Sequence, residues 1–177
     1  PVISFLQGFT MGGGVGVGCH GTHRIVGESS QIAMPECGIG LIPDVGGTWL
    51  LSRSSVGAYV GLTGHRMGPE DAIFTGFADS YIPRLMWPEL IRTLCETGDV
   101  AAIKAATHSP PNGTLIQQAD DLADYLATLG FREAREIRNV ERQCRPEPGH
   151  GGEACHEVAN ERGSLGARGG RRQHFCQ

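Results

Sequence analysis

Short apolar runs separated by glycine-rich turns dominate the first third of the chain and predict short strands. The run VISFL at residues 2–6 is typical of a buried strand. Two further runs, at 23–28 and 30–34, predict short strands separated by a turn. The glycine-dense stretch at residues 7–21, between the first two of these runs, predicts a turn that enters a helix near Gly13–His20, although each glycine costs a helix roughly 1 kcal/mol relative to alanine. So many glycines indicate a close approach of the backbone to another group.

Apolar residues at helical spacing dominate the later part of the chain. The predicted elements are a helix within 46–64, a helix from Pro69, a short strand near 77–82, and helices within 86–99 and 116–130. Residues 110–113, with two prolines and a glycine, separate the last two helical segments. Because short strands come first and helices later, we expect an α/β core with a helical C-terminal part.

Length and charge limit the classes of function. The chain has 177 residues and a net charge of −4, which suits one domain with a buried core. No long basic block is present, so neither a nucleic-acid surface nor a polybasic membrane contact is expected. The apolar runs fall short of the roughly 18 residues that a membrane helix needs.

The two ends of the chain differ from its middle. The chain begins with Pro1 and enters a strand-like run directly, as a sequence entered midway would. Its last 32 residues contain seven glycines and few larger apolar residues, too few to offset the entropy cost of ordering them. We therefore expect a partial domain at 1–130 and an atypical tail at 131–177 that is disordered, truncated or frame-shifted.

The six cysteines form no regular framework, and scattered reduced thiols are the simplest interpretation. Cys19, His20 and His23 form a C-H-x-x-H cluster that could suggest zinc. A zinc site needs a second pair of ligands at a suitable spacing, and none is evident in the sequence. No metal site is therefore predicted.

The glycine run is the first candidate for chemistry. Gly12–Gly14, at a strand-to-helix turn, would present backbone N–H groups to a phosphate or to the oxyanion of an acyl-transfer intermediate. A flexible turn without function is the plainer alternative. Gly16, Gly18 and Gly21 also fit G-x-G-x-x-G, but no strand runs directly into the first of them and no acid follows at the required distance. A dinucleotide site is therefore the weaker interpretation.

Two acids form the second candidate. Glu36 and Asp44 each follow a proline in a stretch that is otherwise apolar or rich in glycine. A buried, unpaired charge is costly, so such groups are usually paired or functional, while a surface loop is the ordinary alternative. Free N–H groups in the glycine turn after Asp44 would stabilise a nearby anion. Two acids and a set of backbone donors together predict an acyl-transfer site.

Residues 11–53 and 61–82 resemble the crotonase (enoyl-CoA hydratase/isomerase) superfamily, and within it the 3-hydroxyisobutyryl-CoA hydrolase branch. The resemblance implies an α/β spiral core. It also implies that Gly13 supplies half of an oxyanion hole, that Glu36 attacks the thioester carbonyl or activates water, and that Asp44 orients the substrate or the water. These three residues would bind the substrate. His20 matches a histidine of the family pattern, for which we expect a structural role.

Two positions separate hydrolases from hydratases in this resemblance. Gly16 stands where hydratases carry their first glutamate, and Asp44 stands where they carry glycine. This exchange favours hydrolysis of 3-hydroxyisobutyryl-CoA, a step of valine breakdown, over addition of water to a double bond. Hydratase or isomerase activity, or a non-catalytic fragment that binds acyl-CoA, remain the alternatives, because the family's other oxyanion donor lies upstream of residue 1.

The sequence and its resemblance also predict the substrate, the partners and the location of the protein. Acyl-CoA would be the substrate, and no cofactor is implied because CoA is part of that substrate. No nucleic acid or membrane partner is expected, and a homo-oligomer is possible. The expected location is the cytoplasm, or the mitochondrial matrix in a eukaryote.

Overall fold

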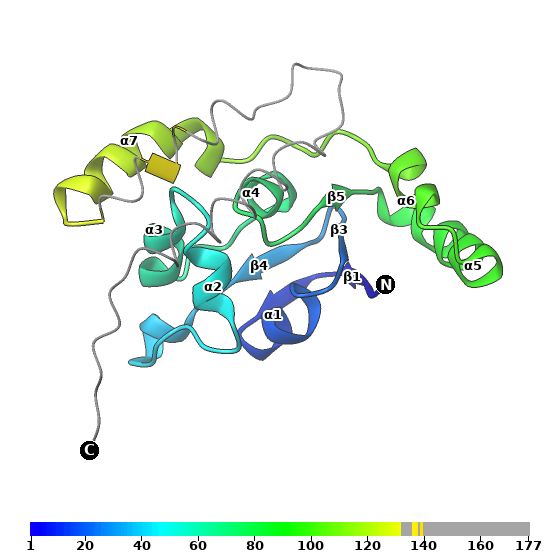
Figure 1. Ribbon diagram of the computed structural model, residues 1–177, viewed down its shortest axis with the longest axis horizontal. Helices are drawn as coiled ribbons and strands as arrows, with labels where there is room; N and C mark the ends of the chain where they lie inside the picture. Colours follow the sequence, from blue (N-terminus) through cyan, green and yellow to red (C-terminus); the bar gives the residue numbers. More distant parts are fainter. Residues whose placement is uncertain (132–135, 138, 140–177) are drawn as a thin grey trace, which may run out of the picture.

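The computed structural model describes residues 1–131, 136, 137 and 139, so the predicted tail lies almost wholly outside the described residues (Figure 1). The strands are β1 (Ile3–Leu6), β2 (Phe9–Met11), β3 (His23–Val26), β4 (Gln31–Ala33) and β5 (Ser80–Tyr81). The α-helices are α1 (Gly13–Gly18), α2 (Gly47–Leu51), α3 (Gly57–Thr63), α4 (Pro69–Phe74), α5 (Trp87–Thr97), α6 (Ala101–Ala106) and α7 (Leu115–Thr128), with 3₁₀ turns η1 (Glu36–Ile39) and η2 (Arg84–Met86). None of the described helices is long and apolar enough to cross a membrane.

The strands form two small parallel sheets, one in the order β1-β3-β5 and the other β2-β4. Ile3 lies opposite His23 in the first sheet, and Phe9 lies opposite Gln31 in the second. The first two passes of the chain each place one strand on each sheet, and β5 then extends the first sheet beside β3, which makes a spiral. The sequence did not predict β2, because its three residues lie inside the glycine-dense stretch and are too few to show a period.

The structure corrects the prediction of one helix within 46–64. Two short helices, α2 and α3, stand there, joined by the turn at 52–56. Gly57 explains the break: a Cβ atom at this residue would lie 1.7 Å from the carbonyl oxygen of Leu51. Only glycine allows the chain to return so closely on itself, and periodicity alone does not reveal such a contact.

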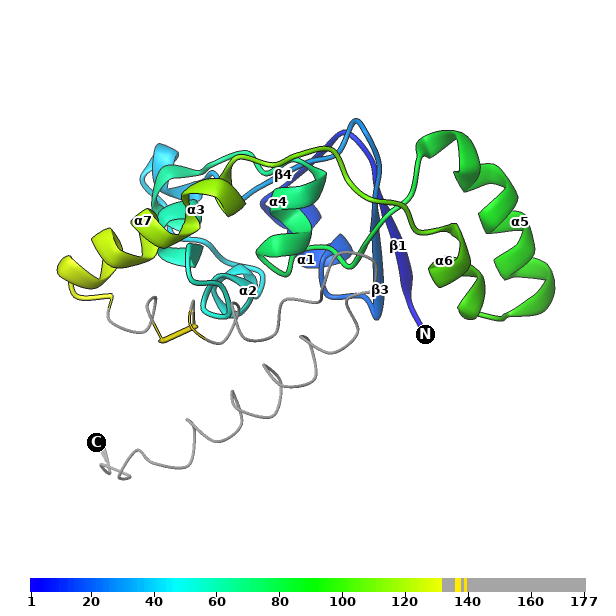
Figure 2. The ribbon, with the colours of Figure 1, turned by 90° about the horizontal axis from the view of Figure 1, so that it is seen from above.

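The core has two principal apolar clusters. The larger lies among the sheets, α1 and the helices α2–α4 and α7, around Ile32, Met34 and Phe77, which are fully buried. The smaller lies under α5 and α6, where Trp87 packs with Ile25 and donates its indole N–H to the carbonyl of Ile82 at 2.8 Å. Figure 2 shows these two helices at one end of the molecule and α3 with α7 at the other.

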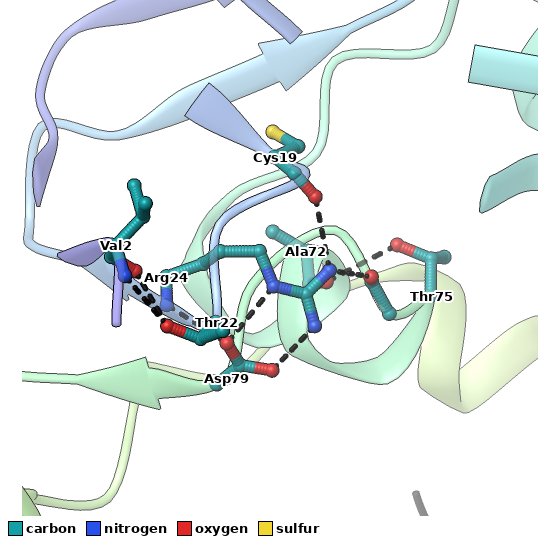
Figure 3. A network of polar contacts seen from close by, with 8 residues as sticks. Val2, Cys19, Thr22, Arg24, Ala72, Thr75 and Asp79 are labelled. Carbon is teal, nitrogen blue, oxygen red and sulfur yellow. Dashed lines mark hydrogen bonds and ion pairs between the residues drawn. The ribbon is translucent and has the colours of Figure 1, made fainter. Parts of the chain in front are cut away.

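A largely buried ion pair joins three segments of the larger core (Figure 3). Arg24 in β3 donates from Nε to Asp79 Oδ2 at 2.9 Å and forms a second contact with the other carboxylate oxygen. The same guanidinium donates to the carbonyls of Cys19 at 3.2 Å and Gly76 at 2.6 Å. The end of α1, strand β3 and the loop before β5 are therefore held by one side chain.

Helix α7 begins on a side chain from another helix. Asp71 of α4 is only 3% exposed, and its Oδ1 accepts the N–H of Leu115 at 2.9 Å. Its Oδ2 accepts the N–H of Thr114 at 3.3 Å. Because the first N–H groups of a helix have no carbonyl acceptor within it, Asp71 caps α7 across 44 residues of sequence.

Burial of the Cys19 thiol makes the free energy of unfolding depend on pH in the alkaline range. Loss of solvation raises its pKa from 9.0 to about 12 in the folded chain, although the positive charge of Arg24 opposes this shift. Between these two pH values the unfolded thiol loses its proton and the folded one keeps it. The free energy of unfolding should therefore fall as pH rises above 9.0, by at most about 1.4 kcal/mol per pH unit from this group.

Denaturant unfolding of the wild type and of Cys19→Ala, measured from pH 8 to pH 10.5, checks this prediction. The variant should lose part of the alkaline decline, while Cys95→Ala, which removes an exposed thiol, should keep it. Tyr81 should contribute to the remaining decline, because its pKa is also raised, first by burial and then by the charge of Glu28. Equal slopes for the wild type and Cys19→Ala would contradict the assignment.

Candidate active site

The glycine run forms a bend with an open outer face. Strand β2 ends at Met11, Gly12 takes a φ of +51°, and α1 begins at Gly13. Gly13 and Gly14 are exposed, and a Cβ atom at Gly13 would meet nothing within 4 Å. As the first residue of its helix, Gly13 has an N–H group without an acceptor in that helix. The bend therefore leaves room for an acceptor atom at this N–H group.

The Glu36 side chain lies directly against this bend. Glu36 is only 7% exposed, and a Cβ atom at Gly12 would lie 2.9 Å from its Oε1. Among the described residues, its Oε2 is buried and has no hydrogen-bond partner. A buried carboxyl oxygen without a partner costs stability, which favours a functional role for this group over a structural one.

Asp44 lies on an exposed turn between η1 and α2 that rests on α1. Its carbonyl accepts the N–H of Gly47 at 2.6 Å, and the following residue, Val45, takes a φ of +46°. A Cβ atom at Gly16 of α1 would lie 2.6 Å from the Cβ of Val45, so the turn packs against the helix there. The structure thus brings the turn that carries Asp44 to the same helix that begins at the bend.

His20, just beyond α1, holds the other side of this turn. Its Nε2 lies 3.1 Å from the carbonyl oxygen of Val45, and a Cβ atom at Gly46 would lie 2.8 Å from the same nitrogen. The ring also faces that of Trp49, with centroids 6.2 Å apart. The sequence predicted a structural histidine but not its partner, because the two residues are 25 positions apart and neither shows a local pattern.

The glycines of the G-x-G-x-x-G match accommodate protein neighbours. A Cβ atom at Gly18 would lie 2.6 Å from a methyl carbon of Leu6, and one at Gly21 would lie 3.0 Å from the Oγ of Ser4. Gly16 is covered by Val45, as described above. These close neighbours account for the glycines without a ligand and remove the support for a dinucleotide site.

The C-H-x-x-H cluster is not assembled as a metal site. Cys19 is fully buried in the larger core, whereas the exposed ring of His20 contacts the Val45 carbonyl. Across the described part of the chain, no group of three His, Cys, Asp or Glu side chains could hold a metal ion.

Comparison with known proteins places these features in one family. The family profile described as enoyl-CoA hydratase/isomerase matches residues 1–144. The chain is 42% identical over 100 residues to a probable 3-hydroxyisobutyryl-CoA hydrolase of Arabidopsis thaliana, which covers 55% of this chain and 26% of that protein. It is 40% identical over 116 residues to the mitochondrial 3-hydroxyisobutyryl-CoA hydrolase of Mus musculus, which covers 62% of this chain and 30% of that protein.

A solved structure supports the same fold. The crystal structure of an enoyl-CoA hydratase from Rhodobacter sphaeroides 2.4.1 matches with 48% identity and a TM-score of 0.68, over 90% of this chain and 44% of that one. The chain thus spans less than half the length of these relatives. The paired parallel sheets are the crotonase-type spiral, and the chain belongs to the enoyl-CoA hydratase/isomerase family.

Proposed function

We propose that the protein represented by this chain hydrolyses the thioester of 3-hydroxyisobutyryl-CoA, or of a similar short 3-hydroxyacyl-CoA, to the free acid and CoA. The single observation that carries this proposal is the Glu36 carboxyl group, buried with an unpartnered Oε2 against the open glycine bend. The similarity to proteins named 3-hydroxyisobutyryl-CoA hydrolase supports the choice of substrate.

In the proposed mechanism the thioester carbonyl oxygen accepts the N–H of Gly13. Glu36 takes a proton from water, and the resulting hydroxide adds to the carbonyl carbon to give a tetrahedral oxyanion. When this intermediate collapses, the carbon–sulfur bond breaks and the proton held by Glu36 passes to the CoA thiolate. In the other route Glu36 attacks the carbonyl carbon directly and the carbon–sulfur bond breaks, which gives an anhydride and the CoA thiolate. Water then hydrolyses the anhydride and supplies the proton that the thiolate takes up. Asp44 orients the substrate hydroxyl or the water.

The environment of Gly16 favours hydrolysis over hydration. The family resemblance implies that hydratases carry their first glutamate at this position. In this chain a Cβ atom at Gly16 would already lie 2.6 Å from the Cβ of Val45. A glutamate side chain would have to displace the turn that carries Asp44. Hydratase activity nevertheless stays the second candidate, because the solved relative with 48% identity is an enoyl-CoA hydratase.

Two substrates distinguish the candidates. We expect the protein to release free thiol from 3-hydroxyisobutyryl-CoA, followed with a thiol reagent, and to leave the absorbance of a short enoyl-CoA unchanged. Loss of the enoyl absorbance without thiol release would assign a hydratase instead. Binding of either ester with no turnover, unchanged in Glu36→Gln, would assign a non-catalytic acyl-CoA-binding protein.

Location and assembly belong to the same proposal. The mouse relative is named as mitochondrial, which supports a mitochondrial location if the source is a eukaryote. We propose the matrix in that case and the cytoplasm otherwise. The acyl-CoA ester is the proposed partner, with CoA as part of the substrate and no further cofactor. Assembly into a homo-oligomer is compatible with this proposal, and sedimentation of the purified protein would measure it.

A further inference from the structure

We propose that His20 is a positioning residue: it holds the strained turn at 43–46 on α1 and so fixes the location of Asp44 in the site. This inference rests on the proposed function, because Asp44 acts in the reaction only if that function holds. The contacts that carry it are those between His20, Val45 and Gly46.

The turn needs something to hold it. Val45 has a φ of +46°, and it is the one non-glycine residue in the described part of the chain with a positive φ. This region is unfavourable for any L-residue and especially for a β-branched one, since Cβ then crowds its own backbone. Strained residues of this kind persist only where the surroundings fix them, and they gather at functional sites.

Three contacts from one short segment hold Val45 in this conformation. Its carbonyl oxygen lies 3.1 Å from His20 Nε2. Gly46 lies against the same imidazole, so closely that any side chain there would meet the ring. The Val45 side chain rests on Gly16, where only glycine leaves room. Because Val45 directly follows Asp44 in the chain, its backbone angles set where Asp44 stands relative to α1.

The chemistry of the contact defines what His20 must carry. A carbonyl oxygen only accepts hydrogen bonds, so His20 Nε2 must bear a hydrogen to make this contact. The Trp49 ring, with its centroid 6.2 Å from that of the imidazole, limits the directions the histidine can take. A glutamine at position 20 could place its amide N–H near the same carbonyl, whereas a leucine of similar size could not donate.

Two substitutions at position 20 and one elsewhere test the inference. His20→Leu removes the donor, His20→Gln restores one, and His108→Leu removes an exposed histidine whose Nδ1 contacts the Ala106 carbonyl at 2.8 Å far along the chain. Two quantities are measured for each protein: the Val45 backbone conformation, from its three-bond HN–Hα coupling and Cα chemical shift, and kcat and KM for thiol release from 3-hydroxyisobutyryl-CoA.

His20→Leu should move the Val45 signals away from positive-φ values and lower kcat by about 10- to 100-fold with little change in KM, as expected when a group that orients the substrate or the water is misplaced by an ångström or so. His20→Gln should retain the Val45 signals and most of the activity, and His108→Leu should match the wild type. This pattern of rescue separates positioning from a general loss of folding.

Unchanged Val45 signals in His20→Leu would overturn the inference whatever the activity. Shifted signals with wild-type kcat would overturn it as well, since the turn would then be held without any consequence for the reaction. If the wild type releases no thiol while His20→Leu still moves Val45, the proposed function fails and the role of His20 in holding the turn stands.

Discussion

Replacement of Glu36 with glutamine should lower kcat for thioester hydrolysis by about 10²- to 10⁴-fold, the range that a general acid–base group typically contributes. Glutamine has nearly the same shape but neither accepts a proton from water nor attacks a carbonyl carbon. KM should change far less than kcat, because Gly13 and the CoA part of the substrate still bind.

Glu36→Gln should also affect stability, in the opposite direction to its effect on activity. Since Glu36 Oε2 is buried with no partner among the described residues, the wild type loses the solvation of that oxygen without compensation. A neutral amide at this position should leave the free energy of unfolding unchanged or raise it by about 1 kcal/mol. Loss of activity without loss of stability is typical of a catalytic group and not of a structural one.

Thiol-release kinetics and urea unfolding of the same samples measure both effects. Glu96→Gln is the matched control, because Glu96 lies exposed on α5 and pairs with the exposed Arg92 of the same helix. The control should match the wild type in both measurements. A Glu36→Gln protein that retains full activity would rule out the proposed mechanism, and one that unfolds more easily would show that the carboxyl group has a structural partner.

Asp71→Ala should reduce the free energy of unfolding by about 2–4 kcal/mol, the range for removing a buried carboxylate that satisfies several donors. The alanine leaves the N–H groups of Thr114 and Leu115 without their acceptor at the start of α7. Leu115 is itself nearly fully buried, so water cannot easily replace the lost carboxylate. The first turn of α7 should therefore loosen from α4 before the rest of the molecule unfolds.

Asp71→Asn removes the negative charge but keeps a hydrogen-bond acceptor, so it separates the contribution of the charge from that of the hydrogen bonds. Its remaining carbonyl oxygen can still accept from Leu115, so it should lose less stability than Asp71→Ala. Urea unfolding gives the free energies, and amide hydrogen exchange should show faster exchange confined first to α7 in the alanine variant. Equal stability of all three proteins, or exchange spread evenly over the chain, would refute the capping role.

Local sequence patterns predicted the elements that are long enough for their apolar residues to show a period. Strands β1, β3 and β4 and the amphipathic α5 lie within the predicted segments, and α7 begins one residue before the segment predicted for it. The break between α2 and α3 was not predictable, because it depends on the contact of Gly57 with the Leu51 carbonyl. Local hydrophobic spacing does not encode a steric contact between backbones.

The sequence likewise predicted some parts of the candidate site and missed others. Glycine spacing and the proline-led acids identified the bend, Glu36 and Asp44 as candidates, and the structure places Glu36 against the bend. The contacts that hold these candidates in place were not predicted, because they join residues far apart in the sequence. His20 and Val45, for example, are 25 positions apart. Such pairs become visible only when the spiral brings successive passes of the chain together.

The spiral has a consequence for how such a catalyst diversifies. The bend with Gly13 belongs to the first pass of the chain, and Glu36 follows the second, on the segment after β4. Strand β2 pairs with β4, and the bend and the Glu36 segment each follow the end of one of these strands, so an acid can be gained or lost on either segment with the strand pairing intact. If the proposed function holds, new reactions can therefore arise in this family by redistribution of a few carboxyl groups, with the Gly13 N–H group proposed to bind the thioester oxygen kept in place.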